Sequence, residues 1–93
     1  MQFNTSELES PLNYVNELLL KKENVKAIRY LNKLLDENPS NYHAWLLLGI
    51  AKRRLGYLDD AINCFTTVTE LNSSLLEAWG LLTIIYLEKA KLD

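Results

Sequence analysis

The sequence is poor in the residues that mark several large classes of protein. Its single cysteine, Cys64, cannot form an internal disulfide bond, which excludes the small secreted domains that disulfides stabilise. It also has a single histidine, no glycine-rich phosphate loop and no set of side chains at metal-ligand spacing. We therefore expect no enzyme active site, no metal site and no cofactor.

The sequence also has no excess of positive charge and no long apolar run. The formal net charge is -2 and the isoelectric point is about 5.4, which disfavour nucleic acid and anionic membranes as partners. The longest apolar run, Ala44–Ala51, is too short to span a bilayer, and residues 1–8 lack a signal-peptide pattern. With 48% hydrophobic residues among 93, the chain predicts one folded, soluble, cytoplasmic domain.

What the sequence does contain is helical periodicity. In residues 24–37 the apolar side chains recur at intervals of three, four and seven, as on one face of an amphipathic helix, and residues 60–71 repeat this pattern. Ser10 and Pro11 read as a helix start, whereas Pro39, Gly56 and residues 72–74 read as stops. The sequence thus predicts five helices with short connections, so that neighbours pack antiparallel.

The sequence also repeats itself after 34 residues. At this shift Ala27 falls on Ala61 and Trp45 on Trp79, and the breaks between helices coincide as well. A supersecondary unit repeated at such a period is typical of stacked helical hairpins.

These residues resemble the tetratricopeptide repeat family. The middle unit carries that family's Trp, Leu, Gly, Gly, Ala and Phe, whereas the first unit has Pro11 at the Trp site and Lys22 at the turn-Gly site. The matching residues are Ala27, Pro39, Trp45, Leu48, Gly49, Gly56, Ala61, Phe65, Trp79, Leu82 and Tyr86. The resemblance implies an all-α, right-handed superhelical solenoid: a single domain, 1–93, with repeats 8–41 and 42–75 and a half repeat or capping helix, 76–93.

The signature residues have physical roles in such a stack. Ala27 and Ala61 are small so that paired helices can approach closely, and Gly49 is expected to serve the same closeness. Trp45 and Trp79 are expected to anchor each unit on the preceding one, where truncation to alanine would cost about 3–5 kcal/mol.

The resemblance further implies protein–protein interaction, since first helices of successive units line a concave groove that holds a peptide. That inner surface would comprise Glu9, Leu12, Asn13, Asn16 and Leu19, then His43, Leu46, Leu47, Ile50, Arg53 and Arg54, and finally Glu77, Gly80, Leu81, Ile84 and Glu88. An apolar floor of Leu12, Leu46, Ile50 and Ile84 favours an amphipathic helix as the ligand. The alternative is that Leu46 and Ile84 only pack against neighbouring helices.

Chaperone-binding members of the family hold a C-terminal tail with lysine, arginine and asparagine in this groove. The corresponding positions here are Leu12, Asn16, Leu47, Glu77 and Leu81, of which only Asn16 is of the required type. We therefore expect no recognition of chaperone tails.

The remaining polar candidates each have a structural interpretation. His43 is expected at the surface, Cys64 as a packing thiol, and Asp59 with Asp60 as a helix start and not a metal site. The basic run 52–54 complements the end of its helix, or Arg53 and Arg54 meet an acidic stretch of a partner.

The last helix is apolar almost all round and lacks the polar outer face of a terminal cap. A missing helix, a partner or a second copy of the chain would cover it. Self-association as a homodimer through Ile85 and Leu87 is therefore the alternative to groove binding.

Overall fold

The computed structural model describes residues 10–92, which form five α-helices and no strand. In chain order these are α2 (Pro11–Leu20), α3 (Asn24–Glu37), α4 (Tyr42–Arg54), α5 (Leu58–Leu71) and α6 (Leu76–Leu92). The expected all-helical fold is confirmed. Residues 8 and 9, with which the first repeat was predicted to begin, and Asp93 lie outside the described residues.

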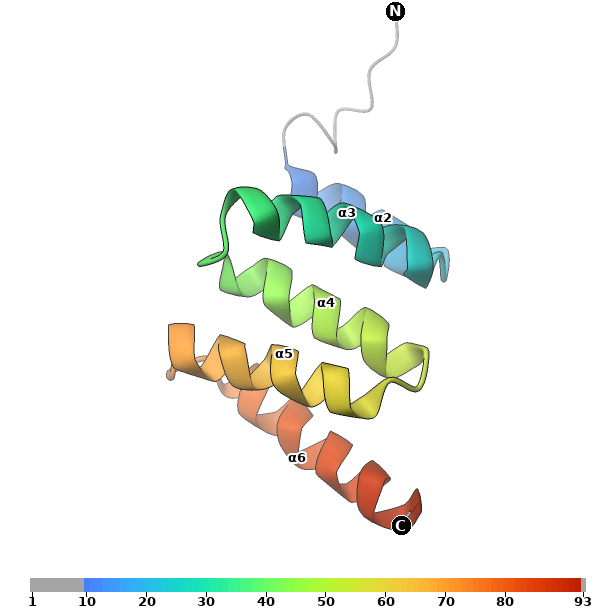
Figure 1. Ribbon diagram of the computed structural model, residues 1–93, viewed down its shortest axis with the longest axis vertical. Helices are drawn as coiled ribbons and strands as arrows, with labels where there is room; N and C mark the ends of the chain where they lie inside the picture. The colour runs from blue at the N-terminus through green and yellow to red at the C-terminus, as the bar shows by residue number, and fades with distance from the viewer. Residues whose placement is uncertain (1–9, 93) are drawn as a thin grey trace, which may run out of the picture.

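The helices follow one another along a single stack. In Figure 1 α2 lies behind α3 at one end, α4 and α5 form the middle, and α6 lies at the other end. Helix α4 packs against both α3 and α5, and α6 packs against α5. The result is a solenoid-like row of helices in which each hairpin rests on the next.

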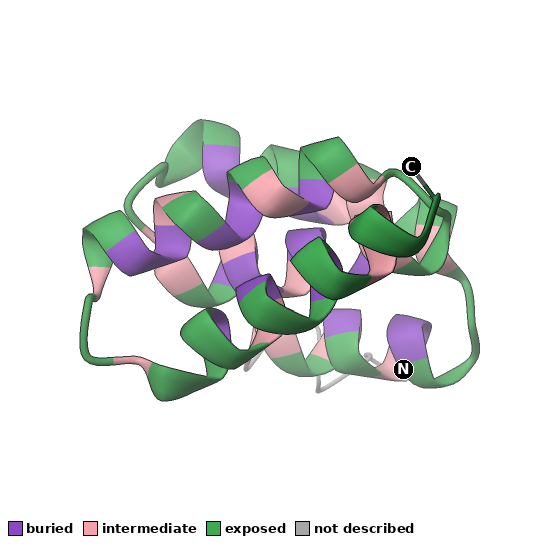
Figure 2. Cartoon of the chain, turned by 90° about the horizontal axis from the view of Figure 1, so that it is seen from below, coloured by how far each residue is buried: buried purple, intermediate pink, exposed green. Residues whose placement is uncertain are grey.

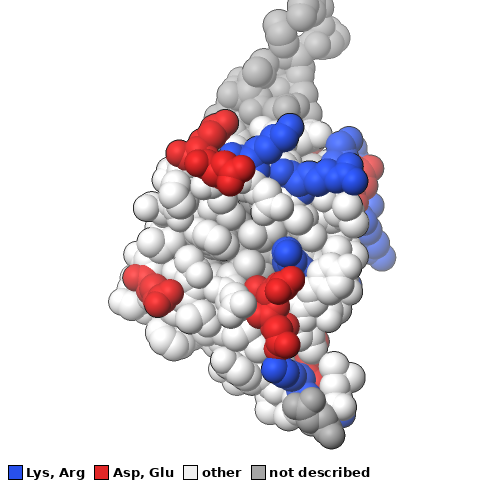
Figure 3. Space-filling model, viewed as in Figure 1, with Lys and Arg blue, Asp and Glu red and all other residues white. Residues whose placement is uncertain are grey.

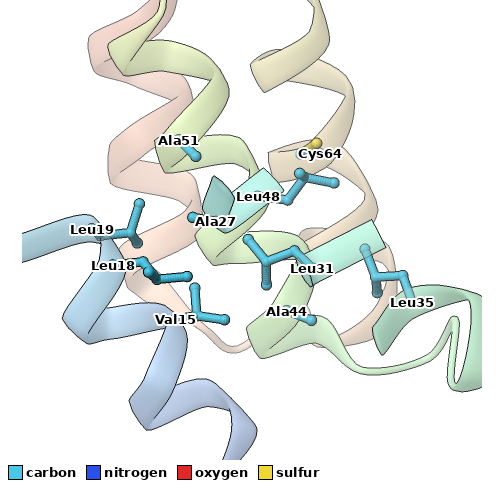
Figure 4. Close-up of a cluster of buried hydrophobic side chains, with 10 residues drawn as sticks. All are labelled: Val15, Leu18, Leu19, Ala27, Leu31, Leu35, Ala44, Leu48, Ala51 and Cys64. Carbon is cyan, nitrogen blue, oxygen red and sulfur yellow. The ribbon is translucent and has the colours of Figure 1, made fainter. Parts of the chain in front are cut away.

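Two clusters of buried apolar side chains hold the stack together. The first joins α2, α3 and α4, with one residue from α5, and comprises Val15, Leu18, Leu19, Ala27, Leu31, Leu35, Ala44, Leu48, Ala51 and, from α5, Cys64 (Figure 4). The second joins α4, α5 and α6 and comprises Leu46, Ala61, Phe65, Val68, Ala78, Leu82 and Ile85. Trp45 packs against both clusters, so it anchors the two repeats as expected.

The repeat seen in the sequence recurs in the hydrogen bonds of the loops. The side-chain oxygen of Asn38 accepts from the backbone N–H of Ser40 at 3.2 Å, and that of Asn72 accepts from Ser74 at the same distance. An Asn side chain that caps its own turn in this way holds the loop after the helix. The loop between α3 and α4 and the loop between α5 and α6 therefore have the same geometry.

The tight turns inside the two hairpins also match each other. Lys22 has φ 61° and Gly56 has φ 85°, both in the left-handed region. The N–H of Glu23 donates to the Leu18 carbonyl and that of Tyr57 to the Lys52 carbonyl, each at 2.9 Å. This is the Schellman ending of a helix, for which glycine is the preferred residue. Lys22 makes the same turn without glycine, at a conformational cost.

The small residues Ala27, Ala61 and Gly49 lie at close contacts between helices, as the sequence predicts. Ala27 and Ala61 are completely buried between helices. A Cβ atom on Gly49 would lie 2.5 Å from Cε1 of Phe65, whose ring on α5 is itself fully buried. Gly49 therefore allows α5 to approach α4 closely.

The anchoring role predicted for Trp79 is wrong. Its side chain is 48% exposed, although its indole N–H donates to the Ser73 carbonyl just as that of Trp45 donates to the Pro39 carbonyl. Trp45 is covered because α5 follows α4, whereas no helix follows α6 within residues 10–92. Seen from below in Figure 2, much of the surface of α6 is exposed.

The two hairpin turns yield a paired prediction. Replacing Gly56 with alanine should lower the free energy of unfolding by about 1 kcal/mol, because a Cβ atom is disfavoured at positive φ. Replacing Lys22 with glycine should raise it by up to about 1 kcal/mol for the same reason. Urea denaturation followed by circular dichroism measures both, and a Lys22→Gly protein less stable than the parent would contradict the interpretation.

The contact between Gly49 and Phe65 yields another. Gly49→Ala should destabilise the fold by about 1–3 kcal/mol, since the buried ring has to shift to admit the methyl group. The control is Gly80→Ala in α6, where a Cβ atom meets nothing within 4 Å and the better helix propensity of alanine should stabilise by up to about 1 kcal/mol. Thermal melts of the two variants should shift in opposite directions.

Candidate functional site

An open hollow of about 370 Å³ lies where three helices meet on one side of the stack. Helix α2 contributes Asn16, Leu19 and Leu20, α4 contributes Leu47, Ile50 and Arg54, and α6 contributes Glu77. These are the first helices of the three repeat units. The hollow has a leucine and isoleucine floor with one cation and one carboxylate at its edge.

Six of the residues predicted for the inner surface line this hollow. They are Asn16, Leu19, Leu47, Ile50, Arg54 and Glu77. The others that the structure describes do not line it: Leu12, Asn13, His43, Leu46, Arg53, Gly80, Leu81, Ile84 and Glu88. Glu9, which was mapped to the same surface, lies outside the described residues.

The predicted apolar floor needs correction. Leu46 is only 6% exposed and belongs to the second core cluster, so the alternative of structural packing holds for it. Leu12 and Leu81 are also partly buried against the two cores. Ile84 is exposed but outside the hollow. The floor consists instead of Leu19, Leu20, Leu47 and Ile50.

Leu20 is the lining residue that sequence reasoning missed. Its side chain is 82% exposed at the last position of α2. The sequence contains a signal for this exposure in the three consecutive leucines 18–20. Leu18 and Leu19 complete the buried face of α2, so the next leucine lies on another side of the helix. A single exposed leucine is common on protein surfaces, so the interest of Leu20 comes from its position beside Leu47 and Ile50 in this hollow.

The basic run at the end of α4 is largely engaged inside the chain. Lys52 pairs with Asp60 at 3.4 Å, and the Arg53 guanidinium pairs with Glu88 of α6, with Nε at 2.7 Å from the carboxylate oxygen. Arg54 donates from Nη1 to the backbone carbonyl of Leu19 at 2.7 Å. Arg53 is therefore committed to holding α6, whereas Arg54 bridges α4 and α2 at the edge of the hollow.

A second hollow, of about 390 Å³, continues from the first past the shared residues Leu19 and Arg54. Its other lining residues are Lys22 and Asn24. The side-chain oxygen of Asn24 is buried and has no hydrogen-bond partner among the described residues. Two cations, Lys22 and Arg54, thus line the second hollow, whereas Glu77 lines only the first.

The residues considered for catalysis show no shared site. His43 is exposed, and its ring lies on Tyr42 with centroids 4.4 Å apart. Cys64 is buried, and burial raises the pKa of its thiol to about 11, so the thiol stays protonated near neutral pH. Asp59 pairs with Lys89 at 2.6 Å. No group of three or more His, Cys, Asp and Glu within residues 10–92 could hold a metal ion.

Among the helices that the structure describes, none has both the length and the apolar character required to cross a bilayer.

The surface predicted for self-association also needs correction. Ile85 is completely buried in the second core cluster, so it cannot contribute to an exposed interface. Leu87 is 61% exposed, as predicted for an uncovered face. The other large exposed apolar side chains of α6 are Leu76, Trp79, Ile84, Tyr86 and Leu92. Helix α6 therefore buries one side and leaves a broad apolar side bare.

Comparison with known proteins agrees with this architecture. The sequence profile described as "Tetratricopeptide repeat" matches residues 18–85. The mouse and human proteins named Superkiller complex protein 3 are each 27% identical to this chain over 82 residues. The match covers 88% of this chain but only 5% of each relative, so the chain spans about a twentieth of their length.

The buried thiol provides a test of the fold around it. With the pKa of Cys64 raised from 9.0 to about 11, its thiolate fraction near pH 8 should fall about a hundredfold on folding. We expect the native protein to react with a disulfide reagent at least that much more slowly than the protein unfolded in urea. Equal rates in the two states would mean that Cys64 is accessible in the native fold.

Proposed function

Because the chain belongs to the tetratricopeptide repeat family, whose members generally mediate protein–protein interactions, we propose that it is a non-enzymatic module that binds an amphipathic helix of a partner protein. The observation that supports this most is the apolar-floored hollow to which α2, α4 and α6 all contribute. A helix with apolar residues three and four positions apart can cover such a floor.

The charges around the groove suggest how such a helix is oriented. Lys22 and Arg54 both line the second hollow, so this part of the groove suits a carboxylate of the ligand. Glu77 lines the first hollow but not the second. A cationic side chain of the ligand would therefore be favoured beside Glu77, in the first hollow. We propose that the bound helix places its acidic end beside Arg54.

The wider context of the module is part of the same proposal. The two mammalian relatives are named as proteins of a complex, which is consistent with a segment that holds partners together. We further propose a cytoplasmic location and no recognition of chaperone tails, since Asn16 alone matches the residues that bind them.

The groove is tested by selecting ligands against it. A displayed library of random 16-residue peptides is panned on the protein, and the selected peptides are measured against Leu20→Glu. Because Leu20 is exposed on the groove, this change should leave the fold intact but weaken binding at least about tenfold. Fluorescence anisotropy gives the affinities.

The matched control is Val25→Glu, which adds the same charge at an exposed apolar position of α3 outside both hollows. It should leave the affinities unchanged. Selected peptides without apolar residues at helical spacing, or equal effects of the two variants, would contradict helix binding in the groove.

A second function, self-association, is supported by the bare side of α6. Trp45 and Gly49 of the preceding unit are covered by α5, whereas the equivalent residues Trp79 and Thr83 of α6 are exposed. We propose that α6 of a second copy supplies this cover in a symmetric dimer, since a two-fold interface pairs the same apolar face with itself.

Light scattering over a range of concentrations tests the dimer. The mass should rise above the 10.7 kDa of a single chain as the concentration increases. Leu87→Glu should keep the protein monomeric, because it places a charge in the centre of the proposed interface. Val25→Glu again serves as the control, and a mass of 10.7 kDa at every concentration would remove the proposal.

A further inference from the structure

Helix α3 carries a row of basic side chains that the sequence does not display as a cluster. Lys26, Arg29 and Lys33 are separated by three and four residues, which brings them onto one face of the helix. All three are exposed. Figure 3 shows basic side chains along α3 in the view of Figure 1, with acidic ones gathered toward one end of that helix.

The stability of the fold does not account for this row. Lys26 lies in the first turn of α3, where the helix dipole disfavours a cation and favours an acidic residue, yet this turn has no acidic residue. Neighbouring like charges at this spacing also repel one another. Within residues 10–92, none of the three forms an ion pair, whereas Lys52, Arg53 and Lys89 all do.

The basic row borders a small concave surface. A hollow of about 150 Å³ is lined by Lys26, Arg29 and Lys33 together with Tyr14 of α2 and Tyr30 of α3. The two tyrosine rings meet edge to face, with centroids 4.9 Å apart and planes at 72°. The rings offer apolar and aromatic area beside the cations, which a ligand can contact while its charges pair with them.

This surface is separate from the proposed groove. None of the five residues lines either of the two hollows of the proposed groove. We propose that the basic face of α3, meaning these five residues, binds an acidic segment of a protein partner. Lys26 and Lys33 lie about 10 Å apart along the helix axis, which three or four residues of an extended acidic peptide would span.

A peptide suits this face better than a nucleic acid does. Three cations release few counterions, so a long polyanion would gain little affinity here. Asp36 and Glu37 follow on the same helix and would repel a phosphate backbone that continued along it. A short acidic run can pair with the basic residues and end before those carboxylates.

The test uses a fluorescein-labelled hexaglutamate peptide, with hexaglutamine and a 12-nucleotide oligouridylate as comparison probes. The intact chain should bind hexaglutamate in a salt-dependent manner and bind the other two probes more weakly. Arg29→Glu with Lys33→Glu should weaken hexaglutamate binding at least about tenfold, because charge-assisted contacts are lost.

The control is Lys21→Glu with Lys91→Glu, which makes the same change in net charge at exposed lysines outside this hollow. This double variant should change the affinity for hexaglutamate by less than about twofold. Leu20→Glu in the groove should lower that affinity no more than its one added negative charge does at an exposed position. Equal losses in the two double variants, undetectable hexaglutamate binding, or tighter binding of oligouridylate would each overturn the proposal. Unchanged circular dichroism spectra verify that both double variants fold.

Discussion

The packing of α4 on two sides at once is the constraint on which the other helices depend. It supplies Ala44, Leu48 and Ala51 to the first core cluster and Leu46 to the second. A helix that buries opposite faces cannot have a polar side, and the sequence of α4 is correspondingly apolar until its last turn. Its small residues also set how near its neighbours come. Without α4, the hairpin of α2 and α3 would lose the surface on which it packs, and α5 would lose its hairpin partner.

The helices and their order were predictable because the signals for them are local. Three of the four loops between the described helices contain a residue whose own chemistry ends a helix: a proline, a glycine or an asparagine that caps its own turn. The repeat adds a second line of evidence, since Lys22 adopts the left-handed conformation of Gly56 although its residue type does not favour it. Position in the repeat therefore outweighed residue preference at this turn.

The sequence predicts less well which side of a helix is buried, because the residues that bury it belong to another part of the molecule. Helix α6 is apolar all round, so its periodicity does not distinguish the buried Ile85 from the exposed Leu87. The expectation for Trp79 failed for the same reason. Trp79 lies beside the Ser73 carbonyl as Trp45 lies beside that of Pro39, but the repeat could not show that no helix within residues 10–92 follows to bury it.

The basic residues show the same division between local and long-range information. The basic residues that are consecutive in the sequence, 52–54, turn out to be held by partners inside the chain. Those of α3 are scattered in the sequence and gather only when the chain is helical. Six of the residues predicted for the inner surface line the hollow, because the repeat register specifies which helices face that side. The repeat register alone does not determine which of those side chains are buried in the core.

The bond from Arg54 to the Leu19 carbonyl affects any ligand that approaches the groove. A free arginine side chain samples many rotamers, and fixing them on binding costs conformational entropy. Here one donor of the guanidinium already holds the side chain against α2, while its other donors are unused by any hydrogen bond within residues 10–92. Folding of the chain has thus restricted this arginine in advance. The same bond makes the shape of the groove edge depend on the N-terminal hairpin, so loosening α2 would also release the arginine.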